Sequence, residues 1–187
     1  MEAKATKPDL VFFGDSITEG WNEHPTIWAS AFGLYKPLNF GMGGDRTQHI
    51  LWRIENGELD GIEPKVVVIM IGTNNITSDT ASGIASGIAR IVELIRAKSP
   101  ATKVLLLGIF PRGKKPDPYR ERVKEVNLTI KKLDDNKNVF FLDLGGKFLQ
   151  SDGTMTKEIM PDFLHPSAKG YQIWAEGMAP LLETLVR

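Results

Sequence analysis

One continuous apolar run constrains the fold of this chain more than any other feature. The run KVVVIMIG, from Lys65 to Gly72, is rich in β-branched residues and shows no alternation with polar ones. This pattern is typical of a strand buried on both faces, as in parallel sheets that helices cover on both sides. We therefore expect a parallel sheet at the centre of the molecule.

Four further apolar runs extend this sheet, at residues 10–14, 36–41, 103–110 and 138–143. Between the runs, apolar residues recur at intervals of three and four, which predicts helices at 46–55, 82–98, 119–133 and 167–185. Ser167 suits the N-cap of the last helix. Pro180 lies inside that helix, where we expect a break.

Strands that alternate with helices imply right-handed β-α-β crossovers. We predict an α/β fold, a three-layer α/β/α sandwich around a five-stranded parallel sheet of flavodoxin-like type. A chain of 187 residues suits one domain, so we expect a single domain over residues 1–187, with residues 1–8 as a flexible N-terminal extension.

Composition excludes several classes of function. Lys+Arg and Asp+Glu both number 23, so we expect no nucleic-acid partner. We interpret the densest basic cluster, Arg112, Lys114 and Lys115, as a solvated loop. Without cysteine the chain has no thiolate nucleophile and no cysteine-based metal site. No apolar run approaches the roughly 20 residues of a membrane span. Residues 1–10 lack the apolar region of a signal peptide, and the compartment stays open.

The segment GDSITEG directly follows the first predicted strand. Ser16 would lie at the start of a helix, where a lone serine is most often a cap. The same position suits a nucleophile, because backbone N–H groups there can stabilise developing negative charge. The segment is not the G-x-S-x-G elbow of α/β-hydrolases, since Thr18 stands in place of the last glycine.

Two further strands are followed by residues that can approach a ligand. Gly41, Gly43 and Gly44 follow the second strand, where glycines either form a turn or let backbone amides approach a ligand. Asn74, in GTNN after the third strand, can stabilise a turn or donate its amide to an oxyanion.

Asp162 and His165 lie three residues apart, between Pro161 and Pro166. In such a constrained D-x-x-H turn the carboxylate can reach Nδ1 of the imidazole and leave Nε2 free to accept a serine proton. We interpret His24 as a surface or loop residue and His49 as support for packing or for the rim of a site. Three histidines with no second paired carboxylate argue against a metal centre.

The ordered blocks GDSITEG, NFGMGGD, GTNN and DFLH resemble the SGNH (GDSL-type) hydrolases over almost the whole chain. Within that family the sequence is most similar to the catalytic subunits of the intracellular platelet-activating-factor acetylhydrolase, and related bacterial acetyl esterases share the blocks. Ile17 replaces the leucine of the literal GDSL string, and Asn75 replaces the aspartate of the commoner G-T-N-D block. Neither change alters the chemistry that the resemblance implies.

The resemblance implies a serine ester hydrolase without cofactor or metal. Ser16 would be the nucleophile, His165 the base and Asp162 its partner, with an oxyanion hole formed by Ser16 N–H, Gly44 N–H and the Asn74 side chain. It favours an acetyl or other short acyl group on a sugar or lipid, and a homodimer. Two alternatives stay open: a flavodoxin-like module that binds phosphate or FMN, and a non-catalytic glycan-binding homologue.

Overall fold

Five parallel strands form the central sheet of the computed structural model, which describes residues 7–187. The strands are β1 (Leu10–Gly14), β2 (Pro37–Gly41), β3 (Val66–Met70), β4 (Lys103–Leu107) and β5 (Val139–Leu142). They are ordered β2-β1-β3-β4-β5 across the sheet. The predicted α/β fold with a five-stranded parallel sheet is therefore confirmed, and this strand order is that of flavodoxin-like sheets.

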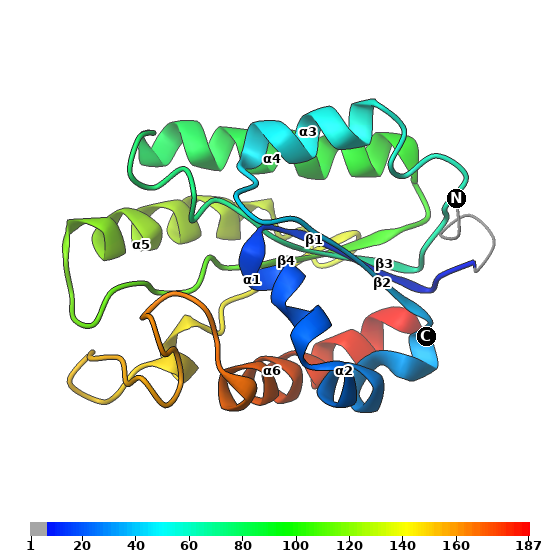
Figure 1. Cartoon of the computed structure of the whole chain (residues 1–187). Helices are drawn as coiled ribbons and strands as arrows, with labels where there is room; N and C mark the ends of the chain where they lie inside the picture. The colour runs from blue at the N-terminus through cyan, green and yellow to red at the C-terminus, as the bar shows by residue number, and fades with distance from the viewer. Residues whose placement is uncertain (1–6) are drawn as a thin grey trace.

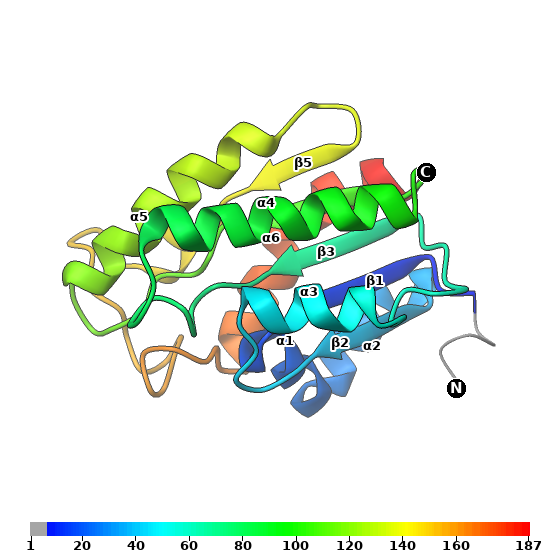
Figure 2. The same cartoon turned by 90° about the horizontal axis from the view of Figure 1, so that it is seen from above.

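Helices cover both faces of the sheet (Figures 1 and 2). One face carries α3 (Thr47–Glu55), α4 (Ala81–Lys98) and α5 (Pro118–Ile130). The other carries α1 (Ser16–Glu19), α2 (Pro25–Phe32) and α6 (Ala168–Val186). Short 3₁₀ turns follow α1, α2 and α5, at Gly20–Glu23, Gly33–Tyr35 and Lys131–Leu133, and a fourth lies at Gly145–Phe148.

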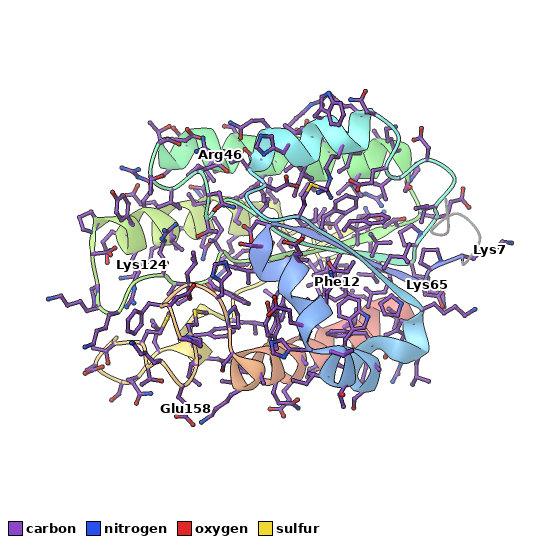
Figure 3. The ribbon with its side chains drawn as sticks, in the orientation of Figure 1. Lys7, Phe12, Arg46, Lys65, Lys124 and Glu158 are labelled. Atoms are coloured by element: carbon purple, nitrogen blue, oxygen red, sulfur yellow. The ribbon has the colours of Figure 1, made fainter. Side chains whose placement is uncertain are left out.

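The absence of polar alternation in β1 follows from this arrangement. Leu10 and Phe12 pack toward α2 and α6, whereas Val11 and Phe13 pack toward α3 and α4, and all four are buried. Figure 3 places Phe12 between the sheet and the helices below it. Burying an apolar side chain of this size contributes about 1.5–3 kcal/mol, so both faces of the strand stabilise the fold.

The predicted helices are present, with bounds that differ from the prediction by one to three residues. Ser167 is the N-cap of α6, and its Oγ accepts a hydrogen bond from Gly170 N–H. The expected break at Pro180 was wrong, because α6 continues to Val186. Met178, Leu182 and Leu185 are buried on one face of this helix, on both sides of the proline. We attribute the continuity to this packing, which offsets the roughly 3 kcal/mol that an interior proline costs.

Three other segments differ from expectation. β4 ends at Leu107 instead of residue 110, because the Asn127 side chain bonds both N–H and C=O of Ile109 in place of a neighbouring strand. The helix α2 was not predicted at all. Of the expected N-terminal extension, residues 1–6 lie outside the described part, and Pro8 is already buried.

No helix within residues 7–187 has the length and apolar character to cross a membrane.

Candidate active site

The loops after the three neighbouring strands β2, β1 and β3 meet at one edge of the sheet. Gly14, the last residue of β1, pairs with Gly41 of β2 and with Met70 of β3. Ser16, Gly44 and Asn74 follow these three strand ends. The chain crosses from β1 to β2 on one side and then to β3 on the other, so the residues lie where strand order reverses, the usual ligand position in such sheets.

Ser16, His165 and Asp162 form one hydrogen-bonded chain. Oγ of Ser16 lies 2.9 Å from Nε2 of His165, and Nδ1 of His165 lies 2.6 Å from Oδ2 of Asp162. The side chains of His165 and Asp162 are 42% and 55% exposed, so a substrate can reach them. The D-x-x-H turn thus adopts the geometry expected from its spacing, and it meets a serine 149 residues away in sequence.

The Asp162 carboxylate is held by its own turn. Its Oδ1 accepts hydrogen bonds from Leu164 N–H at 3.0 Å and His165 N–H at 2.8 Å. Burial acts to raise the pKa of Asp162, but the bonds from the His165 ring and from the two backbone N–H groups outweigh it and hold the pKa below its ordinary value. The carboxylate is therefore ionised at neutral pH and orients the imidazole.

Asp15, and not Ser16, caps α1. Its Oδ1 accepts the N–H of Ile17 at 3.0 Å, which leaves the Ser16 hydroxyl to bond His165. Asp15 is 1% exposed, and burial raises its pKa to about 7. Asp15 was not predicted as the cap, although an aspartate directly before a helix is a recognised capping signal.

The glycine loop, Gly41–Gly44, connects β2 to the approach of α3. Gly41 lies so close to α1 that a Cβ at this position would be 2.2 Å from Glu19 N. Gly44 has a φ of +80°, which favours glycine, and it is exposed. Within the described residues, the Gly44 N–H donates to no protein acceptor. Nδ2 of Asn74 donates to the carbonyl oxygen of Asp45 at 2.9 Å, so this loop and the loop after β3 are in direct contact.

Arg53 of α3 holds both ends of the glycine loop. Its guanidinium donates to the carbonyl oxygen of Phe40 before the loop and, at 2.6 Å, to Oδ2 of Asp45 after it. A third bond runs to Glu58, and the Arg53 side chain is 9% exposed. This role of Arg53 was not predicted, because an arginine on an amphipathic helix is usually solvated.

Asn75 connects the loop after β3 to the start of α3. Its buried side chain accepts Thr47 N–H at 3.1 Å and donates to Gln48 and to Asp79.

Tyr171 of α6 donates its hydroxyl to the carbonyl oxygen of Ile17 at 2.6 Å. The backbone next to Ser16 is thus tied to the helix that directly follows His165.

The interpretation of the basic cluster was correct for Lys114 and Lys115, which are exposed, and wrong for Arg112. Arg112 is half-buried and donates to the carbonyl oxygen of Thr73 at 2.8 Å, next to Asn74. This contact holds the loop after β3. A tertiary acceptor of this kind leaves no trace in the local sequence.

The two remaining histidines lie outside the hydrogen-bonded chain of Ser16. The ring of His24, at the start of α2, lies 4.6 Å from the Tyr171 ring between centroids. Nδ1 of His49 accepts the N–H of Arg46 at 3.1 Å, which caps α3.

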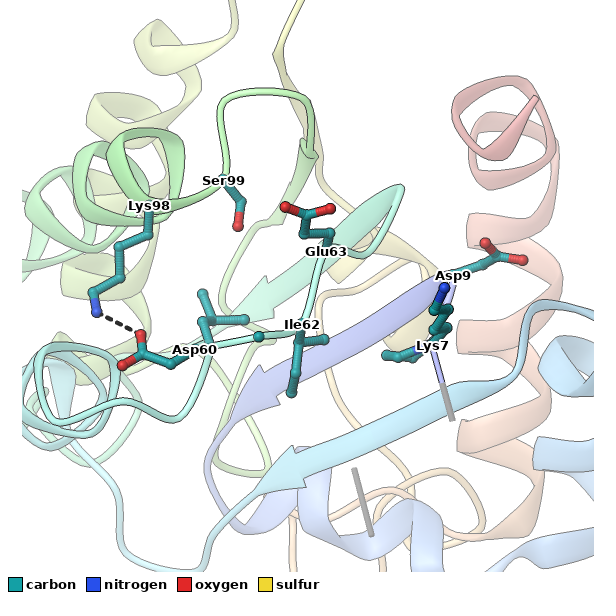
Figure 4. Close-up of a pocket in the computed structure, with 10 residues that line it drawn as sticks. Lys7, Asp9, Asp60, Ile62, Glu63, Lys98 and Ser99 are labelled. Carbon is teal, nitrogen blue, oxygen red and sulfur yellow. Dashed lines mark hydrogen bonds and ion pairs between the residues drawn. The ribbon is translucent and has the colours of Figure 1, made fainter. Parts of the chain in front are cut away.

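A cavity of about 700 Å³ lies at the opposite edge of the sheet, lined by residues 7–9, 59–63, 98 and 99. Figure 4 shows Lys98 bonded to Asp60 at this cavity. None of Ser16, His165 and Asp162 borders it. A search for the active site by cavity size alone would therefore select a region other than the one where Ser16, His165 and Asp162 lie.

Comparison with known proteins agrees with this geometry. The GDSL-like lipase/acylhydrolase family matches residues 12–173. Human platelet-activating factor acetylhydrolase IB subunit alpha2 is 42% identical over 188 residues, which cover 100% of this chain and 80% of the relative. Human subunit alpha1 is 41% identical over 186 residues, which cover 99% of this chain and 80% of the relative.

Two solved structures share the fold at lower identity. A GDSL-like lipase from Bacteroides thetaiotaomicron superposes with a TM-score of 0.81 at 21% identity, over 96% of this chain and 90% of that one. A catalytic mutant of an acetylxylan esterase from Geobacillus stearothermophilus gives 0.73 at 18%, over 92% and 93%. From the family match and the two human relatives we conclude that the chain is an ester-hydrolysing enzyme of the GDSL-like lipase/acylhydrolase family.

Proposed function

We propose that this enzyme is a serine esterase that removes acetyl or other short acyl groups through a covalent acyl-enzyme. The observation that carries the proposal is the hydrogen-bonded chain from Ser16 Oγ through His165 to Asp162. A hydroxyl, a base and a carboxylate in this order are the parts that acyl transfer by serine requires.

In the first step, Ser16 Oγ attacks the ester carbonyl carbon while Nε2 of His165 accepts its proton. Asp162 stabilises the imidazolium that forms. When the tetrahedral intermediate collapses, the ester C–O bond breaks and His165 protonates the leaving alcohol. In the second step, His165 removes a proton from water as the water oxygen attacks the acyl carbon. The bond from that carbon to Ser16 Oγ then breaks, His165 returns its proton to Oγ, and the carboxylic acid is released.

The oxyanion would be bound by Ser16 N–H, Gly44 N–H and the Asn74 side-chain amide. Three features support this assignment: the position of all three residues after adjacent strand ends, the unused N–H of the exposed Gly44, and the contact between Asn74 and the residue that follows Gly44. Loss of one such donor typically lowers kcat by about 10²–10³.

The preference for a short acyl group is supported by the relatives. Two proteins named as acetylhydrolase subunits are 42% and 41% identical, and an acetylxylan esterase shares the fold. Acetyl is the group common to these names, whereas the alcohols differ. We therefore propose acetyl esters as substrates and leave the alcohol unassigned.

Replacement of the nucleophile tests the proposed chemistry. Ser16→Ala should abolish hydrolysis of p-nitrophenyl acetate and labelling by a fluorophosphonate probe, because both need the Ser16 oxygen. Ser151→Ala is the matched control, since Ser151 is exposed and, within the described residues, makes no hydrogen bond to Ser16, His165 or Asp162. Continued labelling of Ser16→Ala would contradict the assignment.

A series of p-nitrophenyl esters tests the acyl preference. The kcat/KM should fall as the acyl chain lengthens from acetyl through butyryl to octanoyl. Each substrate releases the same alcohol, so the series isolates the acyl group. A kcat/KM that rises toward octanoyl would contradict the preference for acetyl while leaving the role of Ser16 untouched.

A further inference from the structure

Glu19 is an exposed carboxylate next to the glycine loop. It lies three residues after Ser16 in α1, a spacing at which side chains are neighbours on a helix surface. Its side chain reaches across to the loop, since a Cβ at Gly43 would lie 2.9 Å from Glu19 Oε2. Glu19 therefore lies between the nucleophile and the residue that precedes Gly44.

The Glu19 carboxylate has no partner within residues 7–187. No hydrogen bond or ion pair of its side chain is formed there. Three neighbouring carboxyl groups do have partners. Asp15 caps Ile17, Asp162 bonds His165, and Asp45 pairs with Arg53. Glu19 thus leaves an uncompensated negative charge at the site.

The nearby cations do not neutralise it. Arg53 bonds Asp45, Glu58 and the Phe40 carbonyl, and Arg46 bonds Ser78 on the loop after β3. The negative field also reaches Asp45, whose pKa is raised mainly by burial and further by Glu19. A charged group on a bound ester would feel the same field.

We propose that Glu19 selects substrates by charge, so that the enzyme favours esters that are neutral or cationic near the glycine loop and discriminates against anionic ones. This inference rests on the proposed function, because that function places the reacting ester between Ser16 and Gly44. Glu19 makes no bond to the reacting atoms, and its effect is on the preference among substrates.

Three aryl acetates with the same acyl group test the proposal: phenyl acetate, 4-acetoxybenzoate, and the acetate ester of 4-(trimethylammonio)phenol. In Glu19→Gln, the ratio of kcat/KM for the anionic to the neutral ester should rise about threefold to tenfold, and the ratio for the cationic ester should fall. The range corresponds to two charges about 6–10 Å apart at an effective dielectric constant of about 40–50, between the values for a protein surface and for bulk water. Both changes in the kcat/KM ratios should be smaller in 0.5 M NaCl, because salt at this concentration screens charges that lie more than a few ångströms apart.

Glu125→Gln is the matched control. It changes net charge equally but lies on α5, exposed and outside the site, so these ratios should stay at wild-type values. Ratios in Glu19→Gln that stay constant or move the other way would overturn the inference alone. Absence of Ser16-dependent hydrolysis of phenyl acetate would overturn the proposed function and the inference with it.

Discussion

At the scale of single residues, the cap of α1 and the proposed nucleophile are two different side chains, Asp15 and Ser16. Serine is a common N-cap, but here Asp15 satisfies the first turn of α1 and the Ser16 hydroxyl bonds His165 instead. Burying Asp15 has an energetic consequence, because a carboxylate without water prefers to hold its proton. The raised pKa of Asp15, about 7, expresses that cost.

The effect of pH on stability follows from this pKa. The folded chain binds the Asp15 proton more tightly than the unfolded chain, whose ordinary pKa is 3.8. The contribution of Asp15 to stability is therefore fully present below about pH 4 and is lost as pH rises toward 7. In Asp15→Asn, which keeps an oxygen to accept Ile17 N–H, this loss should disappear. Its free energy of unfolding relative to wild type should increase by a few kcal/mol between pH 4 and pH 8.

Urea denaturation of both proteins across this pH range measures the difference. Asp152→Asn serves as a control of opposite sign, because the Thr154 hydroxyl and N–H lower the pKa of Asp152. That contribution is present above the ordinary pKa and is lost as the pH falls. The stability of Asp152→Asn should therefore run parallel to that of wild type above about pH 4 and differ in slope only below it. Parallel profiles of wild type and Asp15→Asn would contradict the role of Asp15.

At the scale of elements, α3 positions the glycine loop. Arg53 bonds the backbone before the loop and the carboxylate after it, so the separation of the loop ends depends on one guanidinium. Arginine suits this role because its planar group presents several donors in fixed directions, whereas a lysine ammonium is a single point of charge.

Arg53→Lys should therefore lower kcat about tenfold or more while KM changes little, because Gly44, the proposed oxyanion donor on the loop, loses its fixed position. Arg53→Met should also destabilise the fold by about 3–5 kcal/mol, since it leaves Asp45 buried and unpaired. Glu58→Gln is the control, as it removes the contact of Arg53 that lies outside the loop. Kinetics with p-nitrophenyl acetate and chemical denaturation measure both effects. An unchanged kcat in Arg53→Lys would show that the glycine loop keeps its position without the bonds from the Arg53 guanidinium.

At the scale of the whole molecule, the strands could be predicted from the apolar runs, because a strand that is buried on both faces carries apolar side chains on both. The contact of Asp162 with His165 could be predicted because their spacing is local, whereas the assignment of Ser16 to the same site came from the resemblance of the ordered motifs. The bonds from Arg53 to both ends of the glycine loop could not be predicted, and neither could the contact of Arg112 with Thr73. Both depend on which segments the fold brings together. The continuity of α6 through Pro180 likewise depends on packing against the sheet, which local propensity does not encode.

The bond between Ser16 and His165 joins the start of the first helix to the loop before the last one. This bond therefore forms only after the sheet has assembled and α6 has packed against it. Detachment of α6 would break the bond from Tyr171 to the backbone next to Ser16 and free the loop that carries His165, so ester hydrolysis should stop. Ester hydrolysis by this chain should therefore report whether α6 is packed on the sheet.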